Sequence, residues 1–164
     1  MTLWPFVDQM NPNRGTPPPE VKDVDLNLIQ PGQTRMVQWR SVPVFIRNRT
    51  PQETQLARSR AVADLPDRLA RTHGLPANTP ADDSNRTRGQ DNWLVVVGLC
   101  THMGCLLRPQ HDPAAIEADE GWFCPCHAAR FDLSGRVRSG PARTNLAVPP
   151  YSFLSNQRLR IGES

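Results

Sequence analysis

Two short runs of the chain, CTHMGC at residues 100–105 and CPCH at residues 124–127, contain all four cysteines and two of the four histidines. Thiolate sulfur and imidazole nitrogen are the ligands that zinc and iron–sulfur centres take from proteins. Gly104 and Pro125 favour turns inside these runs, so each run can aim a thiolate and an imidazole at a common point. The residue types and their spacing therefore predict a metal centre built from two loops.

Two kinds of centre fit the candidate ligands, which are Cys100, His102, Cys124 and His127. A tetrahedral structural zinc site is one interpretation, but a Cys-x-His pair is tighter than the usual zinc spacing and leaves Cys105 and Cys126 unexplained. The other is a [2Fe–2S] cluster with two cysteines on one iron and two histidines on the other, which is the ligation of a Rieske centre. His73 and His111 have no such pattern around them and are interpreted as surface residues.

The segments that must position these loops are typical of short strands joined by turns, as 17 prolines and ten glycines in 164 residues suggest. We expect a strand over residues 21–29, where apolar and polar residues alternate, and a continuously apolar strand over residues 93–99, covered on both faces. Hairpins are expected in three other segments, residues 35–49, 130–141 and 151–162.

Residues 51–75 differ and predict a helical insertion. Pro51 suits the first turn of a helix, Thr50 can cap it, and Gly74 can end it. Residues 75–92 are polar and are expected to form a loop. The predicted fold class is therefore all-β with one helical insertion.

Composition excludes some functions. The net charge is only +3, and the basic residues, of which Lys22 is the only lysine, are spread along the chain. Such arginines are typical of a solvated surface, whereas a nucleic-acid partner calls for a basic stripe. No apolar run approaches the roughly 18 residues of a membrane span, so the chain as given is expected to be soluble.

Both ligand runs resemble the cluster-binding loops of Rieske iron–sulfur proteins. FDLSGRVRSGPARTNL resembles the segment after the second loop in the cytochrome bc1 branch, and VPVFIRNRT resembles the early hairpin of that branch. WPFVDQMNP resembles the end of its membrane anchor. This resemblance covers nearly the whole chain and implies a Rieske fold of antiparallel sheets with one [2Fe–2S] cluster per chain.

The resemblance also implies a division of the chain. Residues 21–97 and 142–164 correspond to a base domain, and residues 98–141 to an inserted, smaller cluster-binding lobe. Residues 1–20 correspond to the end of the membrane anchor and a hinge or tether, with the tether at residues 8–20. The rest of the anchor is absent from this chain, so membrane association is expected through a segment that the sequence does not contain.

Carried over position by position, Cys100 and Cys124 bind the inner iron, and His102 and His127 bind the outer one. In the bc1 branch the remaining pair, Cys105 and Cys126, forms a disulfide. It would close a loop of roughly 22 residues, worth about 3 kcal/mol, and would indicate an oxidising compartment. The alternative is two buried free thiols.

Other positions are assigned by the same resemblance. Met103 lies at the quinone-docking tip, and Gly140 and Pro141 belong to the proline loop that shields the cluster. High-potential bc1 proteins usually have Gly-Ser after the second histidine and then a tyrosine, whose hydroxyls donate hydrogen bonds to sulfurs. This chain has Ala128-Ala129 and Phe131. Because such donors stabilise the reduced cluster, we expect a lower potential than is typical.

The resemblance implies the electron-transfer subunit of a quinol–cytochrome c oxidoreductase, on the periplasmic face of a bacterial inner membrane. Its partners would be cytochrome b, cytochrome c1 and a quinol that hydrogen-bonds to His127, with His102 also at the tip. No turnover is expected from the isolated chain. One alternative is the Rieske small subunit of another oxidoreductase, such as arsenite oxidase, although the helical insertion and GPARTNL argue against it. A zinc-stapled binding module is the other.

Overall fold

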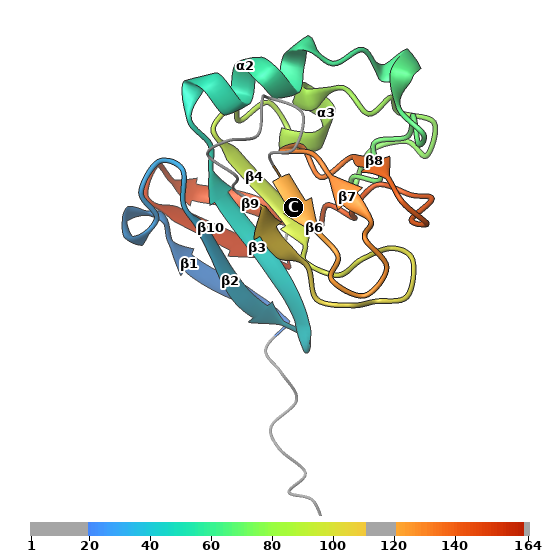
Figure 1. Cartoon of the computed structure of the whole chain (residues 1–164). Coiled ribbons are helices and arrows are strands. Elements are labelled where there is room, and N and C mark those ends of the chain that lie inside the picture. Colours follow the sequence, from blue (N-terminus) through green and yellow to red (C-terminus); the bar gives the residue numbers. More distant parts are fainter. Residues whose placement is uncertain (1–19, 111–120, 163–164) are drawn as a thin grey trace, which may run out of the picture.

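The computed structural model of the chain describes residues 20–110 and 121–162, and its strands form three antiparallel sheets (Figure 1). The first sheet has the order β1 (Lys22–Asp25), β10 (Arg158–Ile161), β9 (Tyr151–Ser155). The second has the order β2 (Thr34–Trp39), β3 (Val42–Asn48), β4 (Trp93–Val97). The third has the order β5 (Arg108–Gln110), β6 (Gly121–Phe123), β7 (Arg130–Phe131), β8 (Val137–Ser139). The predicted all-β class of antiparallel sheets is confirmed.

The three predicted hairpins are all present. β2 and β3 pair from Thr34↔Arg47 to Trp39↔Val42. Arg40 and Ser41 form the two-residue turn between them, with φ angles of 48° and 63°. Positive φ at both positions suits the twist of a tight hairpin, although neither residue is a glycine. The other two hairpins join β7 to β8 and β9 to β10.

β4 lies at the centre of the hydrophobic core and leads directly to the first ligand run. Leu94, Val95 and Val96 are fully buried, which confirms a strand covered on both faces. The same core contains Cys100 and Cys124. Both candidate sulfur ligands are therefore held in place by packing. A ligand that is already fixed loses little conformational freedom when a metal binds.

The helical insertion begins as predicted. In α2 (Pro51–Ser59) the Thr50 side chain accepts a hydrogen bond from the Glu53 N–H at 3.3 Å, and the Glu53 carboxylate accepts one from the Thr50 N–H at 3.1 Å. This reciprocal capping box satisfies two donors that a helix start would otherwise leave unpaired.

The end of the insertion was predicted wrongly. α2 stops at Ser59, and the short 3-10 helix η2 (Val62–Asp64) is the only helix or named strand in the described residues 60–75. The carbonyl of Ala57 accepts a hydrogen bond from Arg136 at 2.7 Å. A side chain 79 residues away thus satisfies a carbonyl at the end of α2, which a longer helix would have paired with its own backbone.

Two further boundaries differ from the prediction. The expected loop at residues 75–92 contains α3 (Asp83–Thr87), capped by the Asp82 carboxylate, which accepts a hydrogen bond from the Asn85 N–H at 2.9 Å. The expected strand at residues 21–29 ends at Asp25 and continues as a 3-10 turn, η1 (Leu26–Leu28). An aspartate caps the start of each short helical element, Asp82 for α3 and Asp25 for η1.

Three arginines are buried, contrary to the expectation of a solvated surface. Arg49, Arg86 and Arg136 are at most 2% exposed. Arg49 pairs with Asp83 at 2.6 Å, and Arg136 pairs with Asp132 at 2.8 Å. Because a buried charge is tolerated only when it is paired and hydrogen-bonded, these contacts fix the β7–β8 turn against the helical segment.

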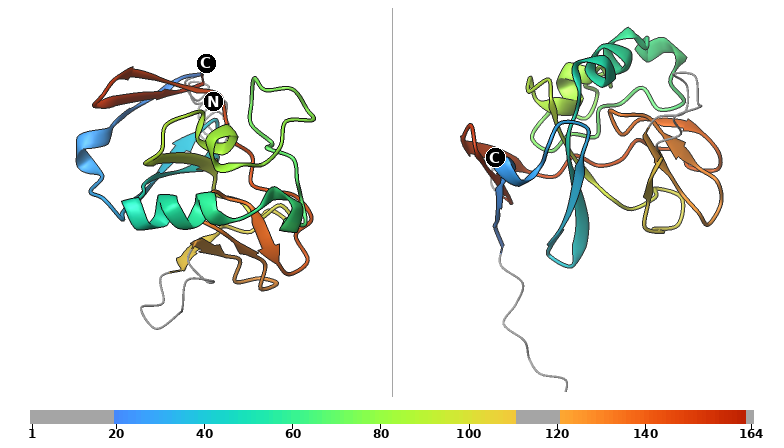
Figure 2. Two further views of the ribbon diagram at one scale, coloured as in Figure 1. Left: turned by 90° about the horizontal axis from the view of Figure 1, so that it is seen from above. Right: turned by 60° about the vertical axis from the view of Figure 1, so that its left-hand side comes forward.

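The two further views in Figure 2 show α2 and α3 on one side of the molecule, and the Tyr151 hydroxyl of β9 donates to the Thr87 carbonyl of α3 at 3.1 Å. Within residues 20–110 and 121–162, no helix is both long and apolar enough to cross a membrane. The predicted end of the anchor and most of the predicted tether fall in residues 1–19, outside the described residues.

Candidate metal centre

Loop 1, residues 100–105, is a closed turn that follows β4. The Cys100 N–H donates to the Cys105 carbonyl at 2.8 Å, and the Gly104 N–H donates to the Cys100 carbonyl at 2.8 Å. Gly104 has a φ of 78°, a left-handed conformation that glycine adopts without strain. Together these contacts turn the Cys100 side chain into the core and leave His102 exposed.

Loop 2, residues 124–129, has the same two backbone hydrogen bonds, which together we call the backbone frame. The Cys124 N–H donates to the Ala129 carbonyl at 2.8 Å, and the Ala128 N–H donates to the Cys124 carbonyl at 3.0 Å. Ala128 occupies the left-handed position with a φ of 60°, where loop 1 has glycine. Loop 2 likewise buries its first cysteine and exposes its histidine, His127.

The structure brings the four predicted ligands together as two pairs, one of cysteines and one of histidines. Cys100 and Cys124 are free thiols, 3% and 0% exposed, and both belong to the hydrophobic core. The rings of His102 and His127 lie with centroids 4.7 Å apart and planes at 90°. One pair of donors is thus buried and the other is exposed.

Burial is the main cause of a raised pKa at the Cys100 thiol, and the adjacent Cys124 raises it further. A thiol must lose its proton to bind a metal. Metal binding here would therefore release protons, and the opposing charge that makes the release favourable would come from the metal itself.

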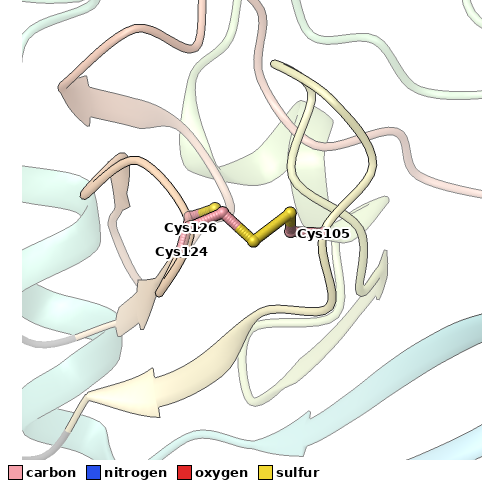
Figure 3. Close-up of side chains that lie close together, drawn as sticks. All are labelled: Cys105, Cys124 and Cys126. Carbon is pink, nitrogen blue, oxygen red and sulfur yellow. A yellow bond between two sulfur atoms is a disulfide. The ribbon is translucent and has the colours of Figure 1, made fainter.

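The predicted disulfide between Cys105 and Cys126 is confirmed, with the two Cα atoms 6.6 Å apart. It joins loop 1 to loop 2. Figure 3 shows it beside the Cys124 thiol, whose sulfur lies within 4.8 Å of both sulfurs of the bond. These three sulfurs are not themselves a metal site, because two of them are bonded to each other. The bond instead holds the two loops together next to a candidate ligand.

The predicted shielding segment packs against loop 2. Gly140 has a φ of 90°, and a Cβ at this position would lie 2.6 Å from the Cα of Ala129. Only glycine allows this approach. On the other side, the Thr101 hydroxyl donates to the Thr144 carbonyl at 2.6 Å. A hollow of about 620 Å³ lies between loop 1 and this segment, and its walls include His102, Pro141 and Arg143.

Three residues that support the shielding segment were missed by the sequence analysis. Asp67 accepts a hydrogen bond from the Asn145 N–H at 2.9 Å, and the Asn145 amide donates to the carbonyls of Asp67 and Leu69, both at 2.9 Å. Arg71 completes the group by donating to Asp67 at 3.0 Å. No local pattern connects residues 78 positions apart, so the sequence contained no signal for this contact.

The pKa of the Asp67 carboxyl reflects this position. Burial acts to raise it, but the hydrogen bonds from Arg71 and from the N–H groups of Asn145 and Leu69 outweigh burial and lower the pKa below its ordinary value. Asp67 is therefore held as a carboxylate.

The surface beside the histidines is apolar. Met103 is 71% exposed and Leu106 is 48% exposed, the former at the tip of loop 1. Pro125 and Pro141 are also exposed. By contrast, Trp122, just before loop 2, is buried and stacks on Phe45 with ring centroids 6.1 Å apart.

A family model described as the Rieske [2Fe-2S] domain matches residues 80–151, which include both loops and the shielding segment. The ubiquinol-cytochrome c reductase iron-sulfur subunit of Rickettsia conorii is 45% identical over 162 residues, covering 98% of this chain and 82% of the relative. The chain belongs to the family of Rieske iron–sulfur subunits of ubiquinol–cytochrome c reductase. The subunit of Bradyrhizobium diazoefficiens is 43% identical over 163 residues, covering 98% of this chain and 82% of the relative.

Among solved structures, a chain described as part of a hyperthermophilic respiratory Complex III is similar at 23% identity with a TM-score of 0.49, covering 96% of this chain and 87% of that chain. For this Rieske chain, the cofactor is a Rieske-type [2Fe–2S] cluster. Its donor set fits that group, since two buried thiols adjoin two exposed imidazoles. The other cysteines are already joined in the disulfide.

Two positions of this Rieske chain lack the hydroxyl groups expected beside such a centre. Ala129 is fully buried and Phe131 is 2% exposed. Neither a methyl nor a phenyl group can donate a hydrogen bond. Both side chains are packed in the wall of loop 2 and in β7, so a hydroxyl at either position would be shielded from water.

Proposed function

We propose that this chain is the electron-transfer subunit of a quinol–cytochrome c oxidoreductase, which takes an electron and a proton from a hydroquinone and passes the electron to cytochrome c1. The observation that carries the proposal is the pair of exposed imidazoles, with ring centroids 4.7 Å apart, on the same two loops as two buried thiols. An accessible nitrogen pair allows a substrate to reach the centre. The near full-length similarity to reductase subunits favours this complex over others.

In this proposal Cys100 and Cys124 bind the inner iron, and His102 and His127 bind the outer one. The support is the burial of the two thiols and the exposure of the two rings. The Cys105–Cys126 disulfide holds the loops that present them. When bound, a Rieske cluster supplies a one-electron acceptor of higher potential than an all-cysteine cluster.

The histidines also handle the proton. The outward ring nitrogen of His127 accepts a hydrogen bond from the hydroquinone hydroxyl and then holds its proton, and His102 offers a second such nitrogen. Met103, which follows His102 in the chain, and Pro141, which lines a hollow with His102, are exposed and can exclude water when the tip docks. A dry contact strengthens the hydrogen bond on which the transfer depends.

We further propose that the base domain, residues 21–97 and 142–164, and the cluster-binding lobe, residues 98–141, move as one body. Arg49 donates to the Leu133 carbonyl at 3.3 Å, and Arg136 donates to the Ala57 carbonyl at 2.7 Å, so buried contacts link the lobe to the helical insertion. The motion that carries the tip between partners then belongs to the tether, residues 8–20.

Partners in this scheme are the cytochrome b and cytochrome c1 subunits, with the chain on the periplasmic face of a bacterial inner membrane. Reductase subunits belong to a respiratory membrane complex, and the disulfide suits an oxidising compartment. Turnover requires those partners, so the isolated chain is expected to exchange electrons without catalysing quinol oxidation.

The Rieske small subunit of another oxidoreductase, such as arsenite oxidase, is not favoured. The curated relatives that cover 98% of this chain at 43% to 45% identity are reductase iron–sulfur subunits. Reconstitution with cytochrome b, and failure to associate with a molybdenum subunit, is the expected outcome.

The deciding experiment is an EPR spectrum of the reduced chain followed by a redox titration against pH. We expect the signal of a reduced [2Fe–2S] cluster, which zinc cannot give. We also expect a midpoint that falls by about 59 mV per pH unit in the range where one electron is coupled to one proton. A colourless zinc protein, or a midpoint that stays constant from acid to strong alkali, would overturn the proposal.

A further inference from the structure

Arg143 lies in the segment that shields the centre, next to an exposed imidazole. Its side chain is exposed and lines the hollow of about 620 Å³ that His102 also lines. The backbone is fixed at this place, since the Thr101 hydroxyl donates to the Thr144 carbonyl at 2.6 Å. These two threonines are the chain neighbours of His102 and Arg143, so the hydrogen bond holds one backbone beside the other.

The residues around Arg143 are also held in place. Ala142 is 5% exposed, and the N–H of buried Asn145 donates to the Asp67 carboxylate at 2.9 Å. Asp67 is itself paired with Arg71 at 3.0 Å. The backbone of Arg143 is therefore anchored on both sides, and its guanidinium can move only in the surroundings of the hollow.

No neighbouring carboxylate neutralises the positive charge of Arg143 in the described part of the chain. Within residues 98–110 and 121–144, Asp132 is the one acidic residue, and it is buried and paired with Arg136 at 2.8 Å. Among the described residues, no ion pair joins the Arg143 guanidinium to a carboxylate. A full positive charge therefore remains at the hollow beside the exposed imidazole of loop 1.

A positive charge near a redox centre favours the state that carries more negative charge. Because reduction adds one electron to the cluster, an uncompensated guanidinium stabilises the reduced state. We propose that Arg143 raises the midpoint potential of the cluster through its charge, from its place beside His102. The inference rests on the centre of the proposed function, where a higher midpoint makes the cluster a stronger acceptor for the electron of a hydroquinone. The charge then partly offsets the missing hydroxyl donors at Ala129 and Phe131.

A charge series at position 143, in the full chain with its cluster, tests the proposal. Arg143→Lys keeps the charge, Arg143→Gln removes it and Arg143→Glu reverses it. Protein-film voltammetry at an ionic strength of about 10 mM measures the midpoint of each. We expect no change for the lysine variant. For the glutamine variant the equilibrium constant for reduction should fall about two- to fivefold, which corresponds to about 18 to 41 mV for one electron. The glutamate variant should shift about twice as far.

Salt should screen the shift, because the Arg143 side chain is exposed. The Debye length falls from about 30 Å at 0.01 M ionic strength to about 3 Å at 1 M, so the difference between Arg143→Gln and the unmodified chain should disappear at the higher value. The matched control is Arg35→Gln, at another exposed arginine, on β2 and outside the hollow. We expect the midpoint of this control to change much less than that of Arg143→Gln.

Two results would overturn the proposal in variants that keep the thermal unfolding and the cluster EPR signal of the unmodified chain. One is an equal midpoint for the unmodified chain, Arg143→Gln and Arg143→Glu at low ionic strength. The other is an equal fall in Arg143→Lys and Arg143→Gln, which would assign the effect to side-chain contacts instead of charge. Either result would leave the proposed electron transfer intact. A missing cluster signal in the unmodified chain would overturn that function, and this inference with it.

Discussion

Loop 1 and loop 2 have the same two backbone hydrogen bonds, but they place different residues on that frame. The histidine is the third residue of loop 1 and the fourth of loop 2. The left-handed position holds Gly104 in loop 1 and Ala128 in loop 2. The shared feature is thus the backbone frame, which buries a sulfur and exposes a ring. Ligand spacing in the sequence can differ between the loops because the two hydrogen bonds fix the first cysteine and the left-handed residue, and the histidine lies between them.

The largest expected effect comes from removing one ring nitrogen from either loop. His102→Ala and His127→Ala should each reduce iron content to near zero, because the outer iron then lacks a ligand. His73→Ala, at an exposed histidine outside both loops, is the control and should retain its iron. Iron analysis and EPR measure both. Full occupancy in either loop variant would show that the two loops are not equivalent contributors.

Cutting the connection between the loops should have the next largest effect. Replacing Cys105 and Cys126 together by serine removes the disulfide and should lower the free energy of unfolding by about 3 kcal/mol. For a chain of this size the melting temperature should fall by roughly 6 to 12 °C. Calorimetry with and without reductant compares the variant with the unmodified chain. An unchanged melting temperature would mean that packing alone aligns the loops.

Loop 2 and β7 lack the expected hydroxyl donors, and restoring them should change the potential. Ala129→Ser with Phe131→Tyr should raise the midpoint by about 80 to 90 mV, if each donor stabilises the reduced cluster by roughly 1 kcal/mol. Phe153→Tyr, on β9, is a matched control and should leave the midpoint unchanged. Protein-film voltammetry measures the midpoint potential of the unmodified chain, the double variant and the control. An unaltered midpoint in the double variant would imply that another donor already serves this site.

The contribution of Asp67 to the free energy of unfolding should depend on pH. Because the folded-state pKa of Asp67 lies below its unfolded value, its charged form stabilises the fold above about pH 4, and this contribution is lost as the pH falls through the lowered pKa. Asp67→Asn should therefore lower the unfolding free energy by about 1 to 2 kcal/mol at pH 7 and by much less at pH 2. Denaturant unfolding at both pH values checks this. An equal loss at both would point to packing instead of charge.

The smallest effect is expected from exchanging the residues at the left-handed positions. Ala128→Gly should raise the unfolding free energy by roughly 0.5 to 1 kcal/mol, because glycine adopts a φ of 60° without strain. Gly104→Ala should lower it by about 1 kcal/mol. A Cβ at Gly104 meets no atom within 4 Å, so that loss would be backbone strain alone. Two changes of the same sign in denaturant titrations would contradict the shared frame.

Much of the fold was predictable because its determinants are local. The β2–β3 and β9–β10 hairpins, the buried β4 and the start of α2 follow from alternation, apolar runs and a capping residue. The end of α2 was not predictable, since Arg136 provides the partner for the Ala57 carbonyl from far along the chain. α3 could not be distinguished from a loop by sequence. Its segment is polar, and an aspartate such as its cap, Asp82, is common in loops as well as at helix starts.

The sequence by itself determined the chemistry of the centre, because two cysteines and two histidines in paired short runs restrict the donor set before any geometry is known. The tertiary structure confirmed the disulfide that the resemblance implied, and only it showed that the two free cysteines are buried in the core while the two histidines are exposed. It also decided that Asp67 supports Asn145 and that three arginines lie in the core. These contacts join residues far apart in the chain, and their energies depend on burial, which no local pattern encodes.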